Sequence, residues 1–293
     1  MNLHNFVELC MCPAPLGNEH TAKQLIRSML PNGLEISEDV AGSAIVRKPG
    51  EKPGLTFFAS LSQPVVLVTG KKSDGAWELQ PLGTGKTLEP MNGWKVMDSG
   101  GAQAKLGVKD GALRLTEDRG VQIGSLLTRQ PDWTQDVLSV SCAGIEDRVG
   151  CWLLTELLRE MPDVKAEITC IFLAQEQHCT KVAELAMNET DAAVAIRLAS
   201  AKVNDINLTG APVNAGGGPV LKLRERYVST DGRLMDLERM ACREAGVPFQ
   251  YEVLELDVTG LCTAQYGHCG VVVGGIDVPA EEGRILLTDL RNT

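Results

Sequence analysis

The chain has 293 residues and a formal net charge of −10, and 44% of its residues are hydrophobic and 23% are charged. This length allows one large core or two domains, and the composition is that of an ordinary globular protein. The acidic balance argues against nucleic acid and against an anionic membrane as partners. No apolar run approaches the roughly 18 residues that a membrane-spanning helix needs.

The cysteines and the start of the chain indicate a cytoplasmic protein. The nine cysteines are odd in number and scattered, as is expected of free thiols in a reducing compartment. Cys10 and Cys12 have no second pair at metal-ligand spacing, so a zinc module is not expected. The segment before Pro13 carries Glu8 and no basic stretch, which is not the pattern of a signal peptide.

The first part of the chain has the pattern of two helices followed by strands. Apolar residues recur at helical spacing in residues 2–12 and 19–30, and residues 13–17 separate the two helices. Strands are predicted at residues 34–36, 43–47 and 55–59. The last of these is predicted to be buried, and it runs into Ser60 and Ser62.

The pattern changes between residues 65 and 140, where short β-like runs alternate with turn signals. The runs are residues 65–68, 76–80, 94–97, 112–116, 121–125 and 137–140. Such punctuation is typical of a small β-barrel or sandwich. We therefore predict an all-β barrel at residues 63–142, inserted into an α/β domain formed by residues 1–62 and 143–293. Residues 83–86 (GTGK) lack the first glycine of a phosphate loop, so they do not indicate a nucleotide site.

Residues 143–197 alternate between helices and strands. Helices are predicted at residues 149–161 and 181–187, and buried strands at residues 166–174 and 192–198. Strands joined through a helix form a right-handed parallel unit, and the loops at their carboxyl ends meet at one edge of the sheet. The polar segments expected to converge there are Glu146-Asp147-Arg148, residues 175–178 and Arg197.

The α/β pattern resumes after Arg197. The predicted elements are a polar loop at 201–218, strands at 219–226, 249–256 and 270–276, helices at 231–245 and 259–266, and a last element at 285–290. Gly246 and Pro248 follow the first of these helices in the order that is typical of a helix end. This order predicts an α/β fold with a mostly parallel sheet.

Five segments of the chain carry a resemblance to a known family. They are Leu9–Glu19 (LCMCPAPLGNE), Gly75–Gly83 (GAWELQPLG), Gly144–Cys151 (GIEDRVGC), Gln175-Glu176 and Ala245–Gln250 (AGVPFQ). In this order they resemble metallopeptidase family 42, the glutamyl aminopeptidase or endoglucanase-M family of dinuclear-metal aminopeptidases. The resemblance implies a three-layer α/β aminopeptidase domain, an inserted barrel and assembly into homo-oligomers.

The residues that this family uses to bind metal are changed here. In sequence order, the family's His-x-Asp is replaced by Ser60 and Ser62, its bridging Asp by Glu146, its Glu by Gln177 and its next Asp by Arg197. The family's general-base Glu is retained as Glu176. No histidine follows Cys269, so the family's last metal ligand has no counterpart.

These replacements predict that the zinc site is lost. Two zinc ions bring four positive charges, and they need deprotonated carboxylates and neutral imidazoles. Without a metal to acidify water, Glu176 has no activated nucleophile. We therefore expect an aminopeptidase-family protein without a cofactor, acting as a non-catalytic homo-oligomer or as a binder of short peptides. We also expect the Arg197 guanidinium to replace the metal between Glu176 and Glu146, holding a carboxylate bidentately.

An active enzyme is the alternative. It would be a peptidase or amidohydrolase with a rebuilt site around Glu146, Asp147 and Glu176, with zinc or cobalt as its cofactor. Other candidate residues have ordinary explanations. The neighbours His178-Cys179 and His268-Cys269 have poor geometry for a base and its nucleophile, and His4 and His20 are expected on solvated helix faces.

Overall fold

The computed structural model describes residues 3–83, 88–204, 212–254 and 258–293. Its largest sheet contains strands β1 (Glu35–Glu38), β2 (Ala44–Lys48), β3 (Glu51–Ser60), β12 (Ala166–Leu173), β13 (Ala192–Lys202), β14 (Val220–Glu225), β15 (Val228–Ser229), β16 (Gln250–Val253) and β17 (Val272–Ala280). The order is β1-β2-β12-β3-β13-β17-β14-β15, with β16 beside β14. The central strands β12, β3, β13 and β17 are parallel, and β2 and β14 pair antiparallel to this block.

Helices cover both faces of this sheet and make three layers. They are α1 (Leu3–Met11), α2 (His20–Met29), α3 (Val149–Glu160), α4 (Lys181–Met187), α5 (Gly232–Ala245), α6 (Gly260–Ala264) and α7 (Leu287–Asn292). One core joins Ile196 of β13 to α1, α2, α3, α5 and α7. A second core joins Phe58 of β3 to α4 and α6. Because successive side chains of a strand point to opposite faces, Arg197 lies on the α4 and α6 face.

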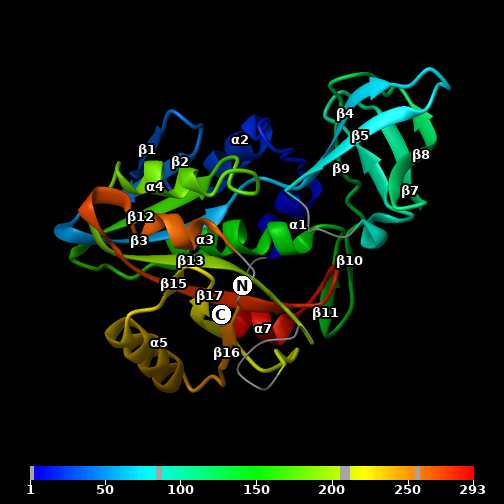
Figure 1. The fold of residues 1–293 in the computed structure, drawn as a ribbon. Coiled ribbons are helices and arrows are strands. Elements are labelled where there is room, and N and C mark those ends of the chain that lie inside the picture. Colours follow the sequence, from blue (N-terminus) through cyan, green and yellow to red (C-terminus); the bar gives the residue numbers. More distant parts are fainter. Residues whose placement is uncertain (1–2, 84–87, 205–211, 255–257) are drawn as a thin grey trace.

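A second sheet lies at one end of the molecule, away from the large sheet (Figure 1). Its strands are β4 (Val65–Lys71), β5 (Trp77–Leu82), β6 (Lys95–Met97), β7 (Gln103–Lys109), β8 (Ala112–Arg119) and β9 (Leu126–Arg129). They are ordered β5-β4-β9-β6-β7-β8, and β5 also contacts β8, so the sheet is nearly closed. It has its own core, which includes Val68, Leu106 and Leu127. We propose that it is the inserted domain predicted at residues 63–142.

A small third sheet links the two parts of the chain. It contains β10 (Thr134–Gln135), β11 (Ser139–Ser141) and β18 (Arg284–Leu286). The described part of the chain also has three short 3₁₀ helices: η1 (Glu89–Met91), η2 (Ile145–Asp147) and η3 (Gly267–Cys269). Within the described residues, no helix combines the length and the apolar character needed to cross a membrane.

Some predicted elements of the second sheet are wrong. Residues 121–125 form a turn rather than a strand, because Gly120 and Gly124 both have positive φ angles. The strand predicted at residues 137–140 is shifted to β11 and pairs with β18 instead of the second sheet. Its first two residues are exposed, and the Asp136 carboxylate accepts backbone N–H groups at this bend. Strand β7 was not predicted.

One expectation about the large sheet also needs correction. Strand β13 extends to Lys202, so Arg197 lies in its middle rather than at its end. Strand β3 lies between β12 and β13 in the order of the sheet. Parts of the predicted segments 83–86, 201–218 and 249–256 lie outside the described residues.

Candidate functional site

The carboxyl ends of β3 and β12 carry most of the predicted site residues. Ser60 ends β3, Glu176 and Gln177 follow β12, and η2 supplies Glu146 and Asp147. These segments are adjacent because β3 and β12 pair in parallel register, with Leu173 opposite Ser60. The predicted site residues therefore lie at one edge of the sheet, as expected from the sequence. They form two separate groups there.

The first group is centred on Glu176 and Arg197. The Arg197 Nη2 atom lies 3.8 Å from Glu176 Oε1, and the two side chains are 11% and 4% exposed. Glu176 Oε1 also accepts the Gly260 N–H at 2.7 Å. The expected bidentate contact is absent, and Arg197 Nε has no acceptor among the described residues. Burial by itself would lower the pKa of Arg197, but the carboxylates of Glu176 and Asp277 outweigh burial and raise it.

A row of side chains extends this charged group across the sheet. In the strand register, Arg197 of β13 lies opposite Gly275 of β17, and Lys222 of β14 lies opposite Glu252 of β16. Gly275 contributes no side chain to the row, and a Cβ there would lie 3.2 Å from the Lys222 Cβ. The glycine therefore leaves room for two buried cations on either side of β17.

Lys222 holds the far end of this row. Its Nζ atom lies 2.6 Å from Glu252 Oε2 and 3.0 Å from Asp277 Oδ2, and all three side chains are buried. Burial opposes a charged ammonium, but Asp277 and Glu252 outweigh it and raise the pKa of Lys222. Sequence reasoning missed this cluster. A lysine between the apolar residues Leu221 and Leu223 of a predicted strand was the available signal.

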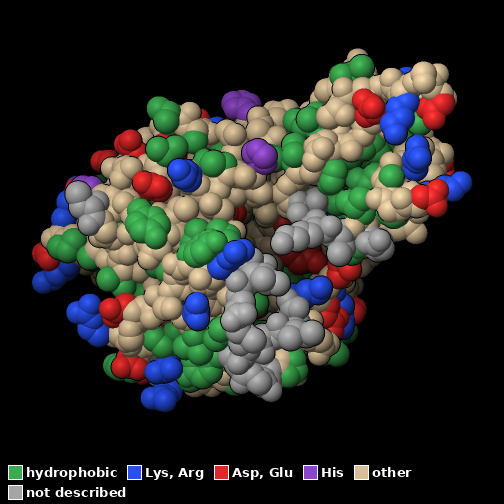
Figure 2. Space-filling view, viewed as in Figure 1, with side chains coloured by type: hydrophobic (Ala, Val, Ile, Leu, Met, Phe, Trp, Pro, Cys, Tyr) green, Lys and Arg blue, Asp and Glu red, His purple; other side chains and the backbone are tan. Residues whose placement is uncertain are grey.

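The second group faces the second sheet and does not include Arg197. A cavity of about 230 Å³ is lined by Glu146, Asp147, Arg129, Glu282 and others. Figure 2 shows the molecule hollowed between the second sheet and the large sheet, with acidic side chains in the hollow. The Glu146 carboxylate accepts the Gly283 N–H. The expectation that Arg197 balances Glu146 as well as Glu176 is therefore wrong.

Two of the carboxyl groups that line this cavity, those of Glu146 and Asp147, have raised pKa values. Burial raises the pKa of Asp147 to about 7, and the neighbouring Glu146 adds to the rise while Arg148 opposes it. Burial also raises the pKa of Glu146, although the Gly283 N–H opposes this. Gln177 Nε2 donates to Asp147 Oδ1 at 3.4 Å. Such partly desolvated carboxyls in a cavity are candidates for binding a cation or for moving a proton.

The remaining residues of the resembling segments have structural contacts. Arg148 is buried and donates to the carbonyl oxygens of Leu61 at 2.7 Å and Cys12 at 3.0 Å. Glu19 is buried too, and its Oε1 accepts the Ser62 hydroxyl at 2.8 Å and the Gln175 N–H at 3.1 Å. The hydrogen bonds of Arg148 and Glu19 therefore connect the loops around the site to one another.

Gly150 permits a close approach between α3 and the sheet. A Cβ at this position would lie 2.3 Å from the carbonyl oxygen of Leu198. Any side chain would therefore push α3 away from β13, and with it the 3₁₀ helix that carries Glu146 and Asp147.

The histidines have the ordinary environments that the sequence predicted. His178 and Cys179 are exposed. His268 contacts Asp191 at 3.2 Å on the surface. His4 lies 3.7 Å from Glu8 and His20 bonds to Gln24, both on helix surfaces.

The residues at this edge do not fit a dinuclear zinc site. The guanidinium of Arg197 brings a positive charge to the carboxylate of Glu176, where a metal would need an anionic ligand. The side-chain amide of Gln177 and the hydroxyl of Ser62 already serve as hydrogen-bond donors to other carboxylates. In residues 3–83, 88–204, 212–254 and 258–293, no three His, Cys, Asp or Glu side chains are grouped as metal ligands.

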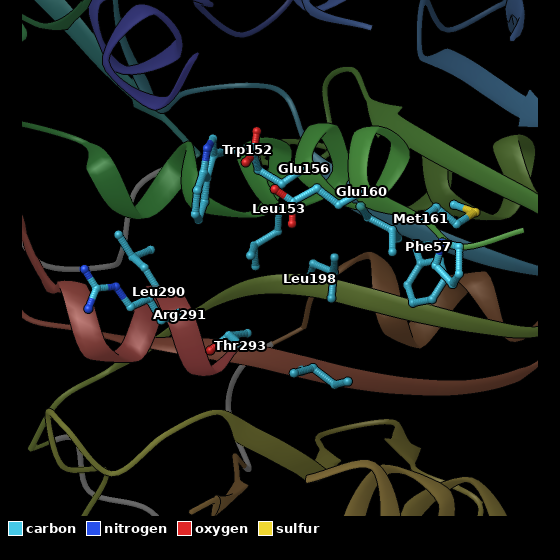
Figure 3. Close-up of a pocket in the computed structure, with 13 residues that line it drawn as sticks. Phe57, Trp152, Leu153, Glu156, Glu160, Met161, Leu198, Leu290, Arg291 and Thr293 are labelled. Atoms are coloured by element: carbon cyan, nitrogen blue, oxygen red, sulfur yellow. The ribbon is translucent and has the colours of Figure 1, made fainter. Parts of the chain in front are cut away.

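A cavity of about 490 Å³ lies on the opposite face of the sheet, between α3 and α7. Figure 3 shows the side chains of Phe57, Leu153 and Leu198 directed into it from β3, α3 and β13. Its lining is mainly apolar, with Glu156, Glu160 and Arg291 among the polar members. Its lining includes none of Glu146, Asp147, Glu176 and Arg197.

Comparison with solved structures shows the same fold in aminopeptidases. The TET aminopeptidase of a Thaumarchaeota archaeon superposes with a TM-score of 0.89 and 16% identity over 99% of this chain and 93% of its own. The TET1 peptidase of Pyrococcus horikoshii superposes with a TM-score of 0.84 and 18% identity, over 99% of this chain and 96% of its own. An endoglucanase of Thermotoga maritima superposes with a TM-score of 0.78 and 19% identity, over 98% of this chain and 93% of its own. The sequence profile of the M42 glutamyl aminopeptidases matches residues 111–283, so this chain belongs to the M42 glutamyl aminopeptidase family.

Proposed function

We propose that this chain is a non-catalytic member of the M42 family that binds short peptides as a homo-oligomer. The contact between Arg197 and Glu176 carries the proposal. A fixed organic cation stands beside the carboxylate at the family's general-base position. It can balance the charge of that carboxylate, but it cannot acidify a water molecule as a metal ion does.

The surroundings of Glu176 also support a structural role. Its Oε1 atom accepts the N–H of Gly260 at the first residue of α6. Thr259, which precedes α6, bonds to the buried carboxylate of Glu225 through its N–H and its hydroxyl. The buried carboxylates of Glu176 and Glu225 thus both accept hydrogen bonds at the start of α6.

The pattern of retained and replaced residues agrees with this role. Within the resembling segments, Arg148, Gly150 and Glu19 keep contacts that hold loops and helices in place. The replacements fall at Ser60, Gln177 and the other positions that in the family bind metal. The retained residues stabilise the fold, whereas the replaced positions would be needed only for binding metal.

The test combines metal analysis with activity. The protein is purified without chelator and its metal content is measured, and aminoacyl chromogenic substrates are assayed with and without zinc or cobalt. We expect no stoichiometric metal and no stimulated cleavage. Two metals per chain, or turnover that chelators and Glu176→Gln both abolish, would contradict the proposal.

The second candidate is a hydrolase with a rebuilt site. The observation in its favour is the cavity at Glu146 and Asp147, where burial raises the pKa of Asp147 to about 7 and so suits it to proton transfer near neutral pH. This enzyme would lose turnover with Asp147→Asn and keep it with Asp163→Asn, a matched change on the exposed surface. Absence of cleavage across amide and peptide substrates favours the non-catalytic role.

A further inference from the structure

Three adjoining hollows form a groove along the barrel. The first is the cavity of about 230 Å³ at Glu146 and Asp147. The second, of about 330 Å³, shares Trp94 and Arg129 with the first. The third, of about 460 Å³, shares Lys95 and Gln130 with the second. The groove therefore leads from the two carboxyl groups, past the Arg129–Trp94 pair, to the outer face of strands β6, β7 and β8.

Carboxyl groups line the groove at the end near the large sheet. Glu146, Asp147 and Glu282 line the first hollow together with Arg129. Arg129 Nη1 lies 3.9 Å from Glu282 Oε1, so this cation offsets Glu282. Two carboxyl groups, those of Glu146 and Asp147, are left facing a cavity that an ammonium group can enter.

The groove is positive at its other end. Lys95 and Lys105 are directly opposed on β6 and β7, an arrangement of like charges that is unfavourable without a counter-charge. Lys105 lies 3.8 Å from Glu117. Within the described residues, Lys95 and Arg119 take part in no ion pair. A basic end is notable in a chain with a net charge of −10.

The acidic groups of the third hollow are already engaged. Asp118 accepts the Trp77 indole N–H at 3.2 Å, and Glu117 is the partner of Lys105. Lys95 and Arg119 therefore remain for a ligand, and a guanidinium can hold a carboxylate through two parallel hydrogen bonds. The middle of the groove offers the Gln130 side chain and the Trp94 ring.

We propose that this groove binds a short peptide by its two charged ends. The free amino terminus lies in the first hollow against Glu146 and Asp147, and the free carboxylate lies in the third hollow against Lys95 and Arg119. The peptide backbone passes the Trp94 and Arg129 pair between them. This proposal rests on the proposed role in peptide binding and names the chemistry that the ligand must have, namely opposite charges at the ends of one linear chain.

Isothermal titration calorimetry with alanine peptides of two to six residues tests the groove. The free peptide is compared with its N-acetyl and its C-amide forms. We expect one length to bind best, and each blocked end to weaken binding about tenfold or more, since a charge-assisted hydrogen bond is lost. Glu146→Gln with Asp147→Asn should remove the effect of acetylation only, and Lys95→Ala with Arg119→Ala the effect of amidation only.

Matched variants and two further readouts keep the outcome decisive. Asp163→Asn and Lys109→Ala, both at exposed positions, should leave affinity unchanged, and thermal melts check that every variant is folded. Absence of binding at all lengths, or binding that neither blocked end weakens, overturns the proposal. A lower oligomer mass for Lys95→Ala with Arg119→Ala also overturns it, because the groove is then a contact between copies of the chain. Mass spectrometry of the titrated peptide separates the two proposals, since a bound but cleaved peptide refutes only the non-catalytic role.

Discussion

The Arg197 Nη2 atom lies 3.8 Å from Glu176 Oε1, and both side chains are almost fully buried. The two residues come from different segments, since Glu176 follows β12 and Arg197 lies within β13, with β3 between the two strands. A buried ion pair contributes little net stability when compared with apolar residues, but it is costly to break from one side. The stability of the folded chain should therefore fall most when only one of the two partners is removed.

Arg197→Ala should destabilise the protein strongly. Removing the guanidinium leaves the Glu176 carboxylate buried and uncompensated, which costs about 3–5 kcal/mol. Arg197→Ala combined with Glu176→Gln should recover part of this loss, because the second change removes the stranded charge. Denaturant unfolding of the single and double variants measures both effects. Arg159→Ala, in a more exposed pair with Glu156, is the control and should have a smaller effect. A neutral Arg197→Ala would refute the substitution of Arg197 for a metal.

The Lys222 cluster should respond in the same way. Lys222→Met keeps the volume of the side chain but leaves Glu252 and Asp277 facing each other in a buried site. We expect a loss of about 3–5 kcal/mol in the free energy of unfolding. Adding Glu252→Gln and Asp277→Asn to this variant should restore part of the loss. If Lys222→Met proves as mild as Lys48→Met, whose partner Asp163 is fully exposed, the cluster is not important for stability.

Glu238 should make stability depend on pH. It is buried on α5, and neither of its carboxylate oxygens has a hydrogen-bond partner among the described residues. Burial raises its pKa to about 8; Arg239 opposes the rise and Asp277 adds to it. Between its ordinary pKa of 4.5 and about 8, the folded chain keeps a proton that the unfolded chain has released. The free energy of unfolding should therefore fall as the pH rises through this window and level off above it.

Glu238→Met should remove this slope and stabilise the protein. The gain should be on the order of a few kcal/mol at pH 8 and smaller near pH 5, because pH 5 lies just above the ordinary pKa of 4.5 at which the unfolded chain begins to release the proton. Urea unfolding at pH 5, 6, 7 and 8 measures the slope for both proteins. Glu244→Met, at an exposed position of the same helix, is the matched control and should keep the slope. An unchanged slope in Glu238→Met would show that other groups cause the pH dependence.

The protein should be a homo-oligomer in solution. The Pyrococcus horikoshii TET1 peptidase, which has the same fold, is described as assembling into a tetrahedron or a large octahedral shell. Light scattering coupled to size exclusion should give a mass that is a multiple of 31.5 kDa across micromolar concentrations. A monomer at every concentration would contradict the expected assembly.

The sequence by itself determined the layered α/β fold and its family. The apolar run at residues 166–174 and the helix-period stripe at residues 149–161 predict β12 and α3 closely, because buried strands and packed helices have strong local patterns. The five resembling segments in their order pointed to the family, and Gly144–Cys151 placed Glu146 and Asp147 beside the strand ends. Strands of the second sheet were predicted less well, because turns such as residues 121–125 depend on glycine conformation rather than on hydrophobicity.

Only the tertiary structure decided which charges meet. Residues that are far apart in sequence are brought together by strand order and register, neither of which has a local signature. The position of β3 between β12 and β13 still allows Arg197 to reach Glu176, and the register across β17 places Lys222 beside Asp277. The same packing places the Gly283 N–H on the Glu146 carboxylate. The sequence could name the replaced residues, but the electrostatic balance among them depends on distances that exist only in the folded chain.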